Sequence, residues 1–171
     1  MCADSRCTDS IGAVVTRAQK IFRLSNKALL GIAGDADVRD VVELLGRATS
    51  KKLPSRKELR ELEADFYGIL VFPNGSIFYI DIGRVDDGAG YWTASIVECR
   101  EKFAAVGSGQ QFAMGALAAG KTARQAIDIA CKYDTASGPP VVEVPLKPQP
   151  RIKPEPPPAI KSTKPRRRSG S

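Results

Sequence analysis

The chain has 171 residues, of which 43% are hydrophobic. This length is sufficient for one domain with a packed core and is short for two domains. Its net charge is +7, and it contains no histidine, which excludes Ser-His-Asp and Cys-His catalysis and most zinc sites that use histidine. No stretch approaches the roughly 18 apolar residues that a membrane span needs, and no basic leader precedes the fold. Four cysteines at unrelated spacings favour reduced thiols. We therefore expect a cytoplasmic protein without a membrane partner.

The first half of the chain predicts short strands followed by two helices. Residues 3–8 (ADSRCT) have the pattern of a strand, and residues 20–34 predict a hairpin with a Ser-Asn turn. A helix is expected within residues 34–48, because valines and leucines recur at helical spacing after acidic capping residues. Residues 54–66 predict a shorter, charged helix that begins after a proline.

The second half predicts a hairpin, a further strand, two helices and a final strand. Residues 69–82 form the clearest hairpin, with two β-branched and aromatic runs joined by Pro-Asn-Gly. After a Gly-rich loop, a strand is expected in residues 102–109, turning at Gly-Ser-Gly into an Ala-rich helix. A helix capped by Thr122 and a strand in residues 139–146 complete the order. This order predicts an α+β fold of antiparallel sheets layered with helices.

Residues 145–171 differ in composition from residues 1–144 and are expected to form a disordered, Pro-rich, basic tail. They hold eight of the twelve prolines, eight Lys or Arg side chains and a single acid, so residues 1–144 are formally neutral. Such a segment cannot bury enough apolar surface to offset the entropy of ordering. Two interpretations stay open: attachment to nucleic acid or an acidic partner through residues 164–168, or a solvated extension.

The remaining polar groups favour one kind of catalysis. No Cys pair has CxxC spacing, GSGQQF lacks the pattern of a nucleotide-binding loop, and DADVRD lacks the central Gly and final Glu of a calcium loop. A scheme without histidine uses the N-terminal residue as nucleophile and its α-amine as proton acceptor. It needs a Lys to lower the nucleophile's pKa, an Asp to fix that Lys, and backbone N–H groups for the oxyanion.

Five collinear motifs resemble one family. They are ADSRCT, QKIFRL, GIAGDAD, AVGSGQQFA and KYDTASGPPVVEV, and together they extend over residues 1–144. The chain resembles the β-type subunits of the proteasome and the bacterial proteasome-related heat-shock protease, which are N-terminal-nucleophile hydrolases. The resemblance implies a four-layer αββα sandwich of two antiparallel sheets and threonine-type peptidase activity. It further implies a homo-oligomeric ring, a peptide or unfolded protein as substrate, an unfolding ATPase as partner, and no metal or cofactor.

The resemblance also implies roles for individual residues. Lys20 would lower the pKa of the nucleophile, and Asp4, sixteen residues earlier, would be its ion-pair partner. Asp134, Ser137 and Ser108 would form a polar network beside the nucleophile. The Gly34 N–H would hold the oxyanion. Taken singly, the same residues also fit purely structural roles: an Asp4–Arg6 ion pair, a solvated Lys20, and a turn motif at a helix end formed by Asp134 and Ser137.

Substrate contacts follow from the same resemblance. The backbones of Thr8, Gly34 and Ala36 would pair with an extended peptide. Ala18, Ile32 and Ala36 would line the pocket for the residue before the cleaved bond, whose small and aliphatic walls favour an apolar side chain.

The start of the chain raises the question of the nucleophile. In the family, the nucleophilic Thr begins a strand that precedes the ADSR strand and lies beside it. Cys2 is a competent nucleophile type, but it lies on the same strand as Asp4 and so should not occupy the position of that Thr. Two possibilities stay open: Met1 is internal and the native chain begins upstream with a Thr, or the chain is inactive. The alternative function is a non-catalytic assembly or binding protein with a basic tail.

Overall fold

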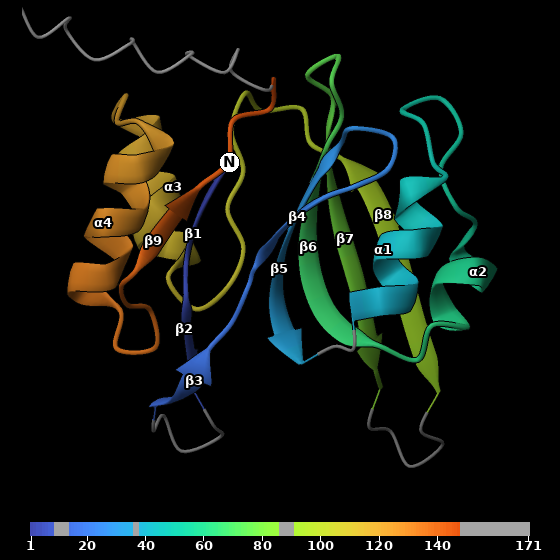
Figure 1. Ribbon diagram of the computed structural model, residues 1–171, viewed down its shortest axis with the longest axis horizontal. Coiled ribbons are helices and arrows are strands. Elements are labelled where there is room, and N and C mark those ends of the chain that lie inside the picture. The colour runs from blue at the N-terminus through green and yellow to red at the C-terminus, as the bar shows by residue number, and fades with distance from the viewer. Residues whose placement is uncertain (9–13, 36–37, 86–90, 148–171) are drawn as a thin grey trace, which may run out of the picture.

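The computed structural model describes residues 1–8, 14–35, 38–85 and 91–147. Within these ranges the chain forms three antiparallel sheets and four helices, which confirms the predicted α+β class with antiparallel sheets (Figure 1). The largest sheet has the strand order β4-β5-β6-β7-β8, and β1-β9 and β2-β3 form two smaller pairs.

Some bounds differ from the prediction: the helix expected in residues 54–66 covers only residues 56–60, and the strand expected in residues 3–8 is two strands. The strands are β1 (Cys2–Asp4), β2 (Arg6–Thr8), β3 (Val14–Arg17), β4 (Ile21–Arg23), β5 (Leu29–Asp35), β6 (Asp65–Val71), β7 (Ile77–Arg84), β8 (Trp92–Glu98) and β9 (Val141–Glu143). The helices are α1 (Val38–Gly46), α2 (Arg56–Arg60), α3 (Gln110–Ala118) and α4 (Ala123–Tyr133).

Both predicted hairpins are confirmed, and their turns are fixed by asparagine. In the β4–β5 turn, Asn26 Oδ1 accepts the Ala28 N–H at 3.0 Å, while its amide donates to the carbonyls of Leu45 and Ala48 at 2.8 Å. In the β6–β7 turn, Asn74 Oδ1 accepts the Ser76 N–H at 3.1 Å. The first asparagine thus also ties the hairpin to the end of α1.

The main core lies between the five-stranded sheet and α1 with α2. Alternate residues of β6 and β7, such as Phe66, Leu70 and Ile80, are buried on this face, and Leu45 and Leu59 meet them from the two helices. The apolar side chains at every second strand position therefore pack against the apolar stripe of α1.

The opposite face of the five-stranded sheet faces a second layer. There α3 and α4 pack against each other through small side chains, including Ala113, Ala116, Ala126 and Ala130, and α4 lies against β1 and β9. Figure 1 shows α3 and α4 beyond β1 and β9, with the five-stranded sheet and then α1 on the other side. Among the described residues, no helix combines the length and apolar composition needed to cross a bilayer.

The strand predicted in residues 102–109 is wrong. Residues 103–106 have no regular secondary structure, whereas β8, which the sequence pattern did not predict, pairs with β7 from Phe78↔Glu98 to Arg84↔Trp92. The physical reason is hydrogen bonding: a strand needs a neighbour, and in the described part of the chain no strand pairs with residues 103–106.

We expect the N-cap of α4 to contribute measurably to stability, because Thr122 and Gln125 form a reciprocal capping box. Thr122→Ala removes the oxygen that accepts the Gln125 N–H and should lower the free energy of unfolding by about 1 kcal/mol. Thr122→Ser keeps that oxygen and is the matched control in urea unfolding. Equal loss in both variants would contradict the assignment.

Candidate functional site

A cleft of about 1130 Å³ separates the two layers of the fold. One wall consists of β1 and β2, another of residues 18–21 and β5, and a third of residues 102–110. The inner faces of α3 and α4 contribute alanines and other aliphatic side chains. The cleft therefore combines an apolar lining with a few polar groups, as ligand sites usually do.

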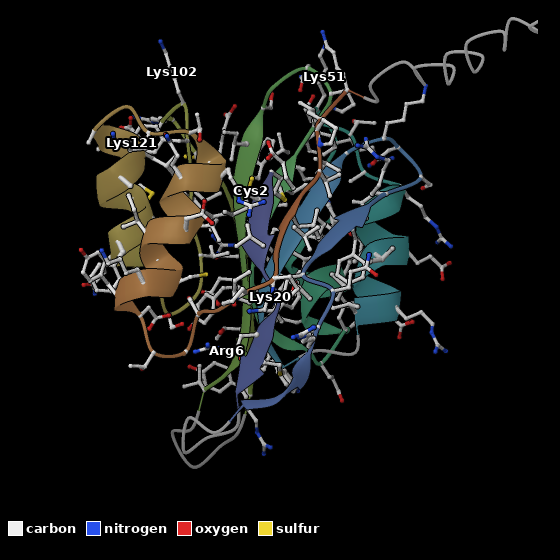
Figure 2. All side chains as sticks on the ribbon, turned by 60° about the vertical axis from the view of Figure 1, so that its left-hand side comes forward. Cys2, Arg6, Lys20, Lys51, Lys102 and Lys121 are labelled. Atoms are coloured by element: carbon white, nitrogen blue, oxygen red, sulfur yellow. The ribbon has the colours of Figure 1, made fainter. Side chains whose placement is uncertain are left out.

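A lysine–aspartate ion pair lies in the wall of this cleft. Lys20 Nζ donates to Asp4 Oδ1 at 2.9 Å, and the two side chains are only 21% and 14% exposed. The other carboxylate oxygen, Oδ2, accepts the backbone N–H groups of Arg6 and Gly138, each at 3.1 Å. In Figure 2, Lys20 lies between Cys2 and Arg6. The ammonium group is thus held in one place by a carboxylate that is itself fixed by the backbone.

A second polar cluster adjoins the first at the end of α4. Ser108 Oγ and Ser137 Oγ both donate to Asp134 Oδ2, at 2.7 and 2.6 Å. Burial by itself would raise the pKa of Asp134, but the hydrogen bonds from Ser137 and Ser108 outweigh it and hold the pKa below its usual value. Asp134 is therefore ionised at neutral pH, and each hydroxyl keeps its proton directed at the carboxylate.

The turn that follows α4 joins the two clusters. Ser137 contacts Asp134, while the next residue, Gly138, donates its N–H to Asp4. The Arg6 guanidinium lies against Gly138, where an added Cβ would come within 2.2 Å of Arg6 Nε, and Arg6 donates to the Thr135 carbonyl at 2.7 Å. A side chain at position 138 would displace the Arg6 guanidinium, so the turn is held between Asp4 and Arg6.

Gly34 presents its backbone to the same cleft. The Ile32 N–H donates to the Lys20 carbonyl at 2.9 Å across one edge of β5, and Gly34, two residues further along the strand, lines the cleft. Gly34 has φ +114°, and a Cβ there would meet the Asp65 carbonyl oxygen at 2.9 Å. Both the conformation and the close packing against β6 require glycine.

The structure brings most of the sequence-predicted residues together. Asp4, Lys20, Ser108, Ser137, Gly34, Ala18 and Ile32 all line the cleft, and Asp134 is bonded to two of them. Thr8 lies in β2, opposite Val14, and Ala36 lies outside the described residues.

Two of the three purely structural roles are wrong. The Asp4–Arg6 ion pair does not form, because Asp4 pairs with Lys20 and the Arg6 side chain contacts Thr135. A solvated Lys20 is wrong for the same reason. The turn motif at a helix end is correct as geometry, since Asp134 is the C-cap of α4 and accepts the Ser137 hydroxyl.

Several residues of the cleft were not singled out from the sequence. Cys7 on β2 and Ala33 on β5 line it, and their strand positions were the only signal that could have found them. Burial raises the pKa of the Cys131 thiol, and the nearby Asp4 carboxylate adds to the effect. Burial likewise raises the pKa of Cys2, which lies on β1 with Asp4, so its thiol is protonated at neutral pH and a poor nucleophile.

No protein-family model matches this chain, and no curated protein matches it in sequence. Within residues 1–8, 14–35, 38–85 and 91–147, no three His, Cys, Asp or Glu side chains are placed to hold a metal ion together. What the chain can do is therefore inferred from its own site.

The two members of the ion pair should differ in their effect on stability. Asp4→Ala leaves two backbone N–H groups and an ammonium group without their acceptor, and we expect a loss of about 2–4 kcal/mol. Lys20→Met leaves Asp4 bonded to both N–H groups, and we expect a loss of about 1 kcal/mol or less. Urea unfolding of the two variants measures the difference, and a larger loss for Lys20→Met would contradict the geometry.

Asp134 should make stability depend on acid pH. Its folded pKa lies below the value near 4 of the unfolded chain, so its contribution is present above about pH 4 and is lost as the pH falls through the folded pKa. We expect Asp134→Asn to lower the free energy of unfolding by about 1–2 kcal/mol at neutral pH, with the difference disappearing in acid. Asp128→Asn, on the exposed face of α4, is the control. A difference that stays constant with pH would contradict the assignment.

Proposed function

We propose that this chain is a proteasome-like threonine-type peptidase, which hydrolyses peptide bonds through an N-terminal nucleophile. The observation that supports this most directly is the Lys20–Asp4 ion pair in the wall of a large cleft, with the Asp134–Ser108–Ser137 cluster at its side. An ammonium group held beside a hydroxyl favours the alkoxide form and so lowers the hydroxyl's pKa.

The proposal includes the four-layer αββα arrangement of an N-terminal-nucleophile hydrolase. The nucleophilic Thr would begin a strand that precedes Met1 in sequence and lies between β1 and residues 103–107. Two observations support this position. In the described part of the chain β1 pairs only with β9, and the cleft runs between β1 and residues 103–107. A strand there would give residues 103–107 the neighbour that their strand-like sequence requires.

The chemistry of the proposed reaction is an acyl transfer in two steps. The threonine oxygen attacks the peptide carbonyl, and its proton passes to the chain's own α-amine, which then protonates the departing amine of the substrate. The Gly34 N–H stabilises the negative oxygen of the intermediate. Water then attacks the resulting ester, releases the acid product and returns the proton to the threonine oxygen. Lys20 keeps its positive charge throughout.

The substrate in this proposal is an extended peptide or unfolded protein. It would add as a strand beside Gly34 and Thr8, and the side chain before the cleaved bond would enter a pocket formed by Ala18 and Ile32. Because these walls are small and aliphatic, apolar side chains are favoured there. A homo-oligomeric ring and an unfolding ATPase belong to the proposal through the resemblance alone.

Peptide hydrolysis by Lys20 variants tests this function. The chain is expressed with the codons upstream of Met1, from an in-frame Thr, and is assayed with a fluorogenic peptide that has an apolar residue before the cleaved bond. We expect Lys20→Met to lower kcat/KM by at least about 1000-fold, since it removes the charge that activates the nucleophile. Lys102→Met, a lysine in another wall of the same cleft, should change it less than about threefold.

A peptide epoxyketone supplies the second readout. Labelling of an N-terminal Thr in the wild type, and its loss in Lys20→Met, would support the peptidase. If the folded wild type is neither labelled nor active, the proposal fails and the non-catalytic binding protein takes its place.

A further inference from the structure

The peptidase site does not account for the excess of Lys and Arg side chains in the chain. Some of these side chains lie together at one end of the folded domain. Lys51, Lys102 and Lys121 project from the upper end in Figure 2. They belong to three separate turns, after α1, after β8 and between α3 and α4, and all three are exposed. In the described part of the chain none of them forms an ion pair.

The surroundings of these lysines reinforce the positive charge. Residues 49–52, 100–102 and 119–122 together contain five Lys or Arg side chains and one acid, Glu101. Since residues 1–144 are formally neutral as a whole, this end is more basic than the rest of the body. Such an asymmetric distribution attracts polyanions over a distance of about one Debye length.

The basic tail departs from the same end. The described chain ends just after β9, at the top of the view in Figure 1, with the exposed Lys147. Residues 148–171 then carry seven Lys or Arg side chains against one acid and contain no aromatic residue. Protein interfaces depend on aromatic anchors, whereas contacts to nucleic-acid phosphates depend on cations. The composition therefore favours nucleic acid over an acidic protein.

We propose that the upper end of the body, through Lys51, Lys102 and Lys121, and the basic tail together bind the phosphate backbone of nucleic acid without sequence specificity. The lysines position the body on the polyanion, and residues 148–171 supply most of the affinity. This function does not depend on the peptidase chemistry, because none of the three lysines forms an ion pair or hydrogen bond with Asp4, Lys20 or Asp134, although Lys102 also lines the cleft.

Binding of the full chain to a fluorescein-labelled DNA duplex of about 20 base pairs, measured by anisotropy at several salt concentrations, tests the proposal. Each phosphate contact contributes about −0.9 to the slope of log K against log salt. We expect the triple variant Lys51→Ala, Lys102→Ala, Lys121→Ala to flatten the slope by about 2–3, and deletion of residues 148–171 to flatten it further. Circular dichroism shows whether each variant is folded.

A second triple variant tests whether the position of the three lysines matters, and not only the number of cations removed. Lys57→Ala, Arg84→Ala and Lys132→Ala remove three exposed cations from α2, the end of β7 and α4, and should leave the slope unchanged. An equal effect of the two triples would overturn the role of the upper end. Displacement of the chain from DNA by polyglutamate at equal charge concentration would overturn the assignment to nucleic acid and indicate an acidic protein.

Discussion

The carboxylate of Asp4 is the group on which the rest of the site depends. It ends β1 and accepts three donors at once: the Lys20 ammonium group and the backbone N–H groups of Arg6 and Gly138. These donors come from the residue before β4, from β2 and from the turn after α4. One partly buried acceptor therefore ties three segments together, and its charge keeps the lysine in the wall of the cleft instead of in solvent.

The layers of the fold explain why this arrangement leaves a cleft. The five-stranded sheet buries one face under α1 and α2, while its other face meets a layer of short strands and Ala-rich helices. Small side chains on α3 and α4 and short strands at β1 and β2 fill less space than the large apolar residues of the main core. The polar clusters lie at the boundary of the two layers, where a ligand meets both.

The sequence predicted the local elements well and the long-range contacts only through the resemblance. Hairpins, helix caps and the stripe of α1 depend on neighbours in the chain, so Asn26, Asn74 and Thr122 were sufficient signals. β8 begins directly after a Gly-rich run and was missed, although Trp92, Ala94 and Ile96 alternate with Thr93 and Ser95 in the period of two that indicates a strand.

In the candidate site, too, the long-range contacts could not be predicted from the sequence pattern. Spacing alone could not reveal that Asp4 contacts Gly138, 134 residues away, or that Arg6 clamps the turn next to it. Ser108 and Ser137 become one cluster only because Asp134 accepts both hydroxyls, which requires the packed position of α4. The roles of these residues were expectations from a family resemblance, and the geometry now gives each of them a definite partner.

The measurement that tests the central claim most directly is a crystal structure of the chain, expressed with the residues encoded in frame before Met1 and treated with a peptide epoxyketone. We predict an adduct on an N-terminal Thr whose strand lies between β1 and residues 103–107, with its oxygen within about 3 Å of Lys20 Nζ. A strand bound elsewhere, or Lys20 turned away from Asp4 into solvent, would contradict the proposed role of the ion pair.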